Sequence, residues 1–474
     1  MKANMKKWIA MSLALVLALS GLTACTKDDK EVSSSATGSN AAGTGESGNK
    51  KVLDDLGGIK VKIGDWYTAE EVDTSTDYMK ATVKFREENA KKYNYTLTRE
   101  NAYSYADMQE LYVNGTMSNS PKCDIFVLYQ EKVSQPMMKG LMYDLSTVKT
   151  LDFKEKKWNT LVNDLMSVGG GQYGMSAVSE PRGGLFFNKR LFEEAGIDPE
   201  EPYDLQKSGK WTWSKLEEYC KKLTKDTDND GKTDQYAMAS FSKYYLPMCA
   251  ATNNAGFIGK DEDGKYVNTM GTDEFLYAMN WGVGLLEDGY IMPKPDGAAW
   301  DWYKAAFRDA EVAMQTAETY EVSAFKDMDD EWGFVMFPYN EKNKDAGLKT
   351  IPNDNIFVIP SCFDAEKAEK IGQVFDLYTE PTPGFEEEDA WKENYYNQFK
   401  DSRALEETLV MMHDPNNQSI SYQPMISDID YGDYCYSVYA RAVTPKKKIE
   451  ELSSKWDAKI ADMNKKYASF TAKK

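Results

Sequence analysis

An acidic run with regular spacing is the part of this sequence whose residue types most directly suggest metal binding. A glycine at position 6 and acids at positions 1, 3, 5 and 9 match a calcium loop, the acids being Asp226, Asp228, Asp230 and Asp234. Position 12, where a bidentate glutamate belongs, is Ala237. Two interpretations stay open, a structural calcium site and an acidic turn between a helix and a strand, and the sequence requires no other cofactor.

Residues for common enzyme chemistry are scarce. The chain has a single histidine, His413, so a Ser-His-Asp triad would have to use that residue, and a metal site with several histidines is excluded. Gly169–Gly171 lacks the spacing of a phosphate-binding loop, and Gly183–Gly184 precedes a predicted strand instead of opening a helix. A hydrolase triad and a nucleotide site are therefore both disfavoured.

The composition is that of a large folded chain with an acidic surface. Of 474 residues, 42% are hydrophobic and 13% are aromatic, which is enough to fill a substantial core. Acidic residues outnumber basic ones 76 to 57, and the net charge is −19. A phosphate backbone would be repelled by this charge, so we expect no nucleic-acid partner.

The N-terminus carries a secretion signal. Lysines precede an apolar stretch, Trp8–Leu19, that is too short for a membrane-spanning helix of about 20 residues. The stretch leads to Leu22–Cys25, which resembles the bacterial lipoprotein signal. Residues 1–24 are therefore expected to be a cleaved signal peptide, and Cys25 is expected to carry palmitate-type acyl chains that anchor the protein in the lipid bilayer. A soluble signal peptide with an incidental cysteine is the alternative.

Residues 25–56 are expected to be a disordered tether, because most of them are small, polar or charged. The cysteines beyond it have no CxxC spacing. We interpret most of them as buried, inert thiols, the set being Cys123, Cys220, Cys249, Cys362 and Cys435.

Strand-like and helix-period segments alternate along the folded part, which predicts α/β layers. Strands are predicted over 59–63, 124–129, 184–187 and 356–359. Helices are predicted over 213–223, over 365–378 and near the C-terminus, where apolar residues recur every three or four positions from Ile449 to Tyr467.

Several motifs in a fixed order resemble those of one family. They are a Tyr-Gly-hydrophobic hinge strand, an aromatic-Asn-Lys strand end, a Leu-Phe-x-x-Ala-Gly helix and a Thr-Trp cap, at Tyr173–Met175, Phe187–Lys189, Leu191–Gly196 and Thr212–Trp213. Further matches follow at Glu311–Met314 and Phe363–Ala368. Over roughly residues 57 to 380 the chain resembles the family 1 extracellular solute-binding proteins, the lipoprotein receptors of sugar-importing ABC transporters. The residues also have a simple structural interpretation, in which Thr212 is an N-cap and Trp213 packs in the core.

The resemblance implies an α/β fold with two lobes, the type II periplasmic-binding-protein fold, in which mixed sheets are flanked by helices and joined by hinge crossings. Crossings are expected near Met175–Gly183 and Thr350–Phe357, with a third beyond residue 395. The first lobe would then comprise residues 57–178 and 352–405, and the second lobe residues 179–351 and 406–474.

The resemblance also implies where a ligand binds. A sugar ring offers flat C–H patches and a rim of hydroxyls, so its receptor needs aromatic faces together with carboxylates, amides and arginine. The candidates follow strands, lie at the hinge or occupy second-lobe loops similar to those of the family, and they are Asp65, Trp66, Tyr129, Glu131, Glu180, Arg182, Tyr244, Tyr245, Trp302 and Tyr320. For Trp302 and its neighbour Trp300, the cleft and the core are equally expected.

These features predict a lipid-anchored receptor on the extracellular face of the bacterial membrane. This receptor would be a monomer that captures a carbohydrate, specifically an oligosaccharide, and delivers it to the permease subunits of an ABC transporter. It would not catalyse a reaction. Alternatives are the same fold binding a non-sugar solute, a secreted glycoside hydrolase and a surface adhesin. The pair Glu131 and Glu180 would suit a hydrolase only at a separation that the sequence does not specify, so both are interpreted as hydroxyl acceptors.

Overall fold

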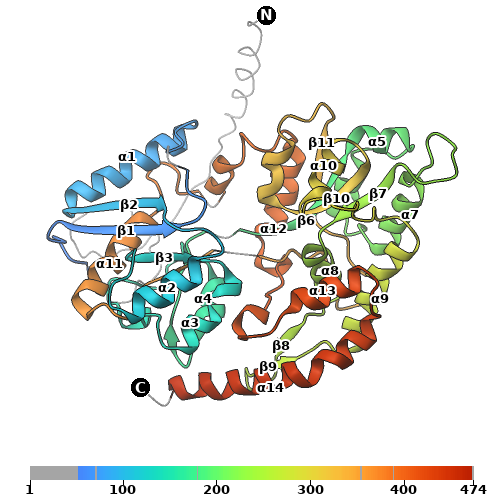
Figure 1. Ribbon diagram of the computed structural model, residues 1–474. Helices are drawn as coiled ribbons and strands as arrows, with labels where there is room; N and C mark the ends of the chain where they lie inside the picture. The colour runs from blue at the N-terminus through green and yellow to red at the C-terminus, as the bar shows by residue number, and fades with distance from the viewer. Residues whose placement is uncertain (1–51, 70–71, 179, 353–354, 388, 472–474) are drawn as a thin grey trace, which may run out of the picture. The chain divides into compact units, whose positions relative to one another are not determined.

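The computed structural model describes residues 52–69, 72–178, 180–352, 355–387 and 389–471, so the predicted signal peptide, Cys25 and most of the predicted tether lie outside the described residues. Two four-stranded sheets flanked by helices organise the described chain (Figure 1). Within these ranges, no helix combines the length and the hydrophobicity needed to cross a membrane.

The first sheet has the strand order β12-β3-β1-β2. β1 (Ile59–Asp65) is parallel to both β2 (Tyr95–Asn101) and β3 (Ile125–Leu128). β12 (Ile356–Val358) comes from a distant part of the chain and is antiparallel to β3. The sheet is therefore mixed, as predicted, and with its helices it is called the first lobe below.

The second sheet has the strand order β11-β6-β10-β7. β6 (Gly183–Asn188) is antiparallel to both β10 (Val312–Glu318) and β11 (Trp332–Val335), whereas β10 is parallel to β7 (Tyr236–Ser240). This sheet is also mixed. With its helices it is called the second lobe.

Helices and short strand pairs complete both lobes. In the first lobe they are α1 (Asp77–Lys92), α2 (Met108–Met117), α3 (Ser134–Met138), α4 (Thr160–Met166), β4 (Ser167–Val168), β5 (Gly171–Gln172) and α11 (Ala365–Tyr378). In the second lobe they are α5 (Lys189–Glu194), α6 (Glu201–Lys207), α7 (Trp213–Leu223), α8 (Ser242–Ala251), β8 (Ile258–Lys260), β9 (Tyr266–Asn268), α9 (Asp273–Glu287) and α10 (Trp302–Arg308). The C-terminal part adds α12 (Val410–His413), α13 (Tyr431–Tyr439) and α14 (Pro445–Thr471).

The local sequence patterns explain these bounds. α7 and α11 begin and end as predicted, and the predicted N-cap Thr212 accepts a hydrogen bond from the backbone N–H of Lys215. Trp213 is buried, as its packing interpretation requires, and it stacks on Trp281 with ring centroids 3.8 Å apart. The five cysteines are free thiols, and all but Cys362 are buried.

Two neighbouring backbone segments connect the sheets where crossings were predicted. The first runs from Met175 toward β6, and the second leads back to β12. Met175 pairs with Phe357 and Pro181 pairs with Pro352, both in antiparallel bridges. The two crossings therefore run side by side and are joined by backbone pairing.

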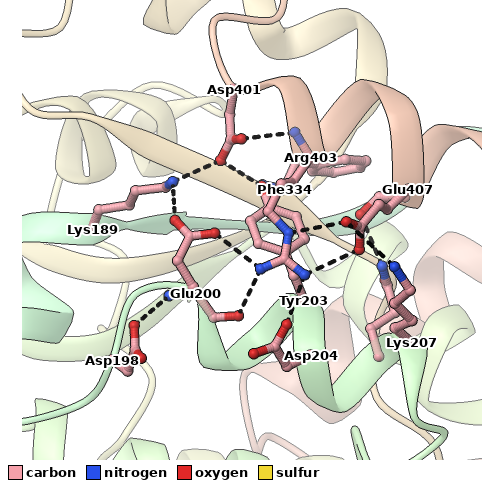
Figure 2. Close-up of polar contacts among 12 residues, drawn as sticks. Lys189, Asp198, Glu200, Tyr203, Asp204, Lys207, Phe334, Asp401, Arg403 and Glu407 are labelled. Atoms are coloured by element: carbon pink, nitrogen blue, oxygen red, sulfur yellow. Dashed lines mark hydrogen bonds and ion pairs between the residues drawn. The ribbon is translucent and has the colours of Figure 1, made fainter. Parts of the chain in front are cut away.

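From Phe399 to Arg403 the chain packs against the second lobe. The Phe399 ring lies 5.8 Å from that of Trp332 on β11. Figure 2 shows the polar network that follows, in which Arg403 contacts Glu200 and Lys189 contacts Asp401, at 3.0 and 2.9 Å. Residues 399–405, assigned above to the first lobe, make these contacts with the second, and the exact bounds of the lobes stay predictions.

The C-terminal helix contacts both lobes. α14 places the buried Trp456 against Phe257 of the second lobe, with ring centroids 6.2 Å apart. Near its end the Phe470 ring lies 5.7 Å from that of Tyr173, which directly follows β5 of the first lobe. One continuous helix thus joins surfaces of the two lobes.

A buried charge cluster fastens α11 to the loop before α4. The Lys157 side chain is 6% exposed, and its Nζ lies 2.8 Å from carboxylate oxygens of both Asp376 and Glu380. Since Asp376 is also buried, the ammonium offsets a charge that would otherwise be costly to remove from water.

Replacing Lys157 with methionine should therefore destabilise the protein, because methionine keeps an apolar stem but removes the ammonium. We expect the free energy of unfolding, measured by urea titration, to fall by about 3 kcal/mol. The control is Lys207→Met, because the Lys207 side chain is 71% exposed and its Nζ lies 3.8 Å from Glu407. That variant should change stability by less than about 0.5 kcal/mol, and equal losses in the two variants would contradict the assignment.

Candidate functional site

A cavity of 1020 Å³ is lined by residues of both lobes and of the C-terminal third of the chain. Several of these residues follow directly on strands that end at the cavity, as expected for ligand sites of α/β sheets. Its aromatic lining consists of Trp66, Tyr67, Tyr105, Tyr129, Phe241, Tyr244, Trp300, Tyr320, Tyr395, Tyr431 and Tyr436, and its charged lining of Glu131, Glu180, Arg182, Lys243 and Glu318.

The first-lobe wall is a cluster of rings around Trp66. The ring centroids of Tyr67, Tyr105 and Tyr129 lie 5.1, 6.0 and 6.4 Å from that of Trp66, all in edge-to-face geometry. Edge-to-face contacts hold aromatic side chains in fixed orientations. The wall therefore presents apolar surface that is already organised for a flat ligand face.

The buried Asp65 holds the loop that carries Trp66. Its carboxylate accepts hydrogen bonds from the backbone N–H groups of Tyr67 and Thr68, at 3.0 and 2.8 Å, and from Nε of Arg99 at 2.8 Å. Arg99 in turn donates to the Tyr67 hydroxyl at 2.6 Å. Asp65 does not line the cavity, so in this structure it supports the wall from behind.

The second-lobe wall combines two tyrosines with an exposed tryptophan. The hydroxyl oxygens of Tyr244 and Tyr320 lie 3.0 Å apart, and Tyr320 is 47% exposed. Trp300 is 58% exposed and contacts Phe241 edge-to-face at 5.9 Å. Burial raises the pKa of both Tyr244 and Tyr320, so both hydroxyls keep their protons. One hydroxyl donates to the other, and the accepting hydroxyl keeps its own proton for a ligand oxygen.

The hinge contributes an ion pair. The Arg182 guanidinium contacts the Glu180 carboxylate, and its Nη1 lies 3.8 Å from Glu318 at the end of β10. The same guanidinium lies 5.5 Å from the centroid of the Tyr320 ring. Arg182 thus joins the hinge to the second-lobe wall.

A bridge at Glu131 connects the lobes across the cavity. Glu131 follows β3, in the short 3₁₀ helix η1 (Gln130–Lys132). Its carboxylate accepts hydrogen bonds from Lys243 on α8 at 2.9 Å and from the Tyr431 hydroxyl on α13 at 2.5 Å. The Glu131 carboxylate is therefore already engaged by second-lobe donors.

The structure brings together most of the predicted ligand residues. Those that line the cavity are Trp66, Tyr129, Glu131, Glu180, Arg182, Tyr244 and Tyr320, and their contact with a ligand stays a prediction. Asp65, Tyr245 and Trp302 do not line it. Tyr245 is fully buried, and its hydroxyl donates to the carbonyl of Gly282. Tyr245 points away from the cavity although Tyr244 lines it, because neighbouring residues on a helix point in different directions. Trp302 opens α10 and contacts Tyr303, and Trp300 of the same segment faces the cavity instead.

Other lining residues escaped the sequence analysis. Lys243 directly precedes the predicted Tyr244, and Glu318 is the last residue of β10, two positions before the predicted Tyr320. Attention to the neighbours of the predicted residues could therefore have found both. The C-terminal segments add Tyr395, Gln398, Gln423, Tyr431 and Tyr436, in a region for which the family motifs gave no guide.

Comparison with known proteins places this geometry in context. Residues 80–371 match the model of a family described as bacterial extracellular solute-binding protein, and no curated protein matches the chain. Similar solved structures include the ABC substrate-binding protein Lmo0181 from Listeria monocytogenes, in complex with cycloalternan, at 17% identity and a TM-score of 0.57 over 86% of this chain and 98% of that one.

Two further structures have the same fold. The cyclic α-maltosyl-1,6-maltose binding protein from Arthrobacter globiformis is 14% identical, with a TM-score of 0.61 over 88% of this chain and 100% of that one. UspC from M. tuberculosis is 16% identical, with a TM-score of 0.59 over 84% of this chain and 100% of that one. At these identities the similarity concerns the fold, and it confirms the predicted two-lobed α/β architecture.

The acidic run forms an exposed loop between α7 and β7. Carboxylate oxygens of Asp226, Asp228 and Asp234 lie within 4.8 Å of one another, whereas Asp230 is not part of this group. The hydroxyl and the backbone N–H of Thr227 donate to Asp234 and hold the pKa of that carboxyl below its usual value. The three grouped carboxylates fit a hard divalent cation, and the same hydrogen bonds also suit an acidic turn, so calcium binding stays a prediction.

Calcium added to chelator-treated protein should raise the melting temperature if this loop is a calcium site. An ion at one hundred times its Kd stabilises the native state by about 2.7 kcal/mol, which shifts the melting temperature of a domain this size by several degrees. Asp228→Ala, which removes a ligand oxygen, should abolish the shift, and Asp263→Ala, in an exposed turn between β8 and β9, should retain it. A melting temperature that does not respond to calcium would leave the acidic turn as the correct interpretation.

Proposed function

Because this chain belongs to the bacterial extracellular solute-binding proteins, we propose that it captures a carbohydrate, an oligosaccharide, in the cavity between its lobes. One observation carries the proposal: aromatic rings and hydrogen-bonding groups line the same cavity from both lobes. This combination matches a ligand with apolar ring faces and a rim of hydroxyls.

The size of the cavity favours several sugar units over one. Its volume of 1020 Å³ lies just above the range of about 300–1,000 Å³ for small-molecule sites. The Lmo0181 structure is a complex with cycloalternan, and the Arthrobacter globiformis protein is named for binding cyclic α-maltosyl-1,6-maltose. Both similarities support a carbohydrate as the class of ligand.

We further propose that the protein passes its ligand to the permease of an ABC transporter and catalyses no reaction. A retaining or inverting glycosidase needs one carboxyl group as a proton donor and a second as nucleophile or base. In this cavity Glu131 is engaged by Lys243, and Glu180 is engaged by Arg182. Both carboxylates already accept contacts from cations of the protein, an arrangement that suits acceptors for sugar hydroxyls better than a proton donor.

Three substitutions test the cavity as the ligand site. Trp66→Ala removes a stacking face from the first lobe, Tyr320→Ala removes one from the second, and Glu180→Ala removes a carboxylate at the hinge. Lost apolar burial at about 25 cal/mol per Å², or a lost charged hydrogen bond of about 1.5–3 kcal/mol, should weaken binding tenfold or more. The affinity is measured by calorimetry with the glycan that gives the largest thermal shift among maltotetraose, cellotetraose, mannobiose and raffinose.

The matched control is Tyr277→Ala, since Tyr277 is 45% exposed on α9 and does not line the cavity. Its affinity should equal that of the unsubstituted protein. Wild-type affinity in all three cavity variants would place the site elsewhere, and new reducing ends after incubation with the glycans would favour a hydrolase.

The membrane anchor is proposed from the sequence alone. Cys25→Ser should abolish incorporation of labelled palmitate and release the protein from the membrane fraction, because several acyl chains at one residue are needed for stable anchoring. Cys362→Ser, which changes a cysteine far from the signal, should keep both properties. Equal membrane association and labelling of the Cys25→Ser variant would refute lipidation at this residue.

A further inference from the structure

Behind the second-lobe wall lies a buried carboxyl group that does not line the cavity. Glu321, in the 3₁₀ helix η3 (Thr319–Phe325), is 1% exposed. Its carboxylate accepts hydrogen bonds from the Tyr303 hydroxyl at 3.2 Å and from Nε2 of Gln315 at 2.9 Å. Nζ of Lys304 lies 3.5 Å from the same carboxylate.

Lys304 is surrounded by aromatic rings. Its Nζ lies 5.3 Å from the ring centroid of Trp300, 5.8 Å from that of Tyr320 and 6.0 Å from that of Tyr303. At these distances the ammonium is attracted to the ring faces, and the attraction is stronger where water is excluded. The Lys304 side chain is 20% exposed, so it is largely withdrawn from water.

Trp300 and Tyr320 need such support. Both line the cavity, and they are 58% and 47% exposed, so much of each ring has no packing partner in the protein. A half-exposed ring that moves freely loses conformational freedom when a ligand stacks on it, and this loss weakens binding. A cation held behind both rings reduces that cost.

We propose that Lys304 and Glu321 are positioning residues for ligand binding: the Lys304 ammonium, held by the buried Glu321 carboxylate, orients Trp300 and Tyr320 as the two stacking faces of the second lobe. The proposal rests on the proposed function, because it concerns the same cavity. Neither residue touches the ligand in this arrangement.

The protonation of Glu321 adds a dependence on pH. Burial raises the pKa of this carboxyl from its usual value of 4.5 to about 8, while Lys304 opposes the rise and Glu318 adds to it. Tyr303, Tyr320 and Tyr244 also face the carboxyl, and burial raises the pKa of each of them, so their hydroxyls stay protonated through this range. Glu321 is therefore expected to change charge near pH 8.

Stability and affinity should respond to this ionisation in opposite directions. A folded-state pKa above the unfolded one means that stability falls as pH rises between the two values and levels off above about 8. Ionised Glu321 instead holds Lys304 more firmly, so ligand affinity should rise as pH passes through about 8. A group that served only to stabilise the fold would not give these opposite signs.

The binding test uses the panel glycan with the largest thermal shift, maltotetraose being the first probe. Lys304→Met should weaken its binding about tenfold at pH 9, and Lys304→Arg, which keeps the charge, should restore most of the loss. At pH 6.5 the affinity of Glu321→Gln should equal that of the wild type. Between pH 6.5 and pH 9 the affinity of the wild type should rise about threefold, and that of Glu321→Gln should not. Over the same interval Glu321→Gln should lose less stability than the wild type. The control is Lys157→Met, a buried lysine outside the cavity, whose Kd should not change.

A second measurement needs no glycan. In protein labelled with 5-fluorotryptophan, the Trp300 resonance is assigned with Trp300→Phe and its linewidth is compared between the wild type and Lys304→Met. A narrower resonance in Lys304→Met would show that the ring has become mobile and would support the proposal, even if no glycan binds and the proposed function fails. An unchanged Trp300 resonance, or wild-type affinity of Lys304→Met for a glycan that binds, would overturn it.

Discussion

The pairing of the two crossings is the constraint on which the cavity depends. Met175 pairs with Phe357 and Pro181 with Pro352, and these segments carry the chain between the sheets. The strand ends on one side present Trp66, and those on the other side present the aromatic rings of the second lobe. Since each wall is rigidly attached to its own sheet, the backbone at the crossings sets how far apart the walls can lie.

Features decided by neighbouring residues could be predicted from the sequence. The cap at Thr212 and the apolar periodicity of 365–378 determine where helices begin and end, and the structure has both helices at those positions. Trp66 and Glu180 also line the cavity as expected, because a strand end or a crossing leaves few directions for its side chains.

Features decided by side-chain direction could not be predicted. Tyr244 lines the cavity while Tyr245 points into the core, and Trp300 lines it while Trp302 does not. Residues one or two positions apart in or beside a helix face different sides, and a sequence that is aromatic at both positions does not reveal which side is the cavity. Asp65 illustrates the same limit, because a carboxylate at a strand end can bind a ligand or its own backbone.

The C-terminal helix restricts how the lobes can move. Trp456 and Phe470 belong to one unbroken helix, and a rise of 1.5 Å per residue places them about 21 Å apart along its axis. An α-helix resists extension, so the Phe257 surface and the Tyr173 surface cannot slide apart while both contacts persist. The helix therefore fixes the distance between these two surfaces. While both contacts persist, the lobes can rotate about the ends of the helix but cannot separate along its axis.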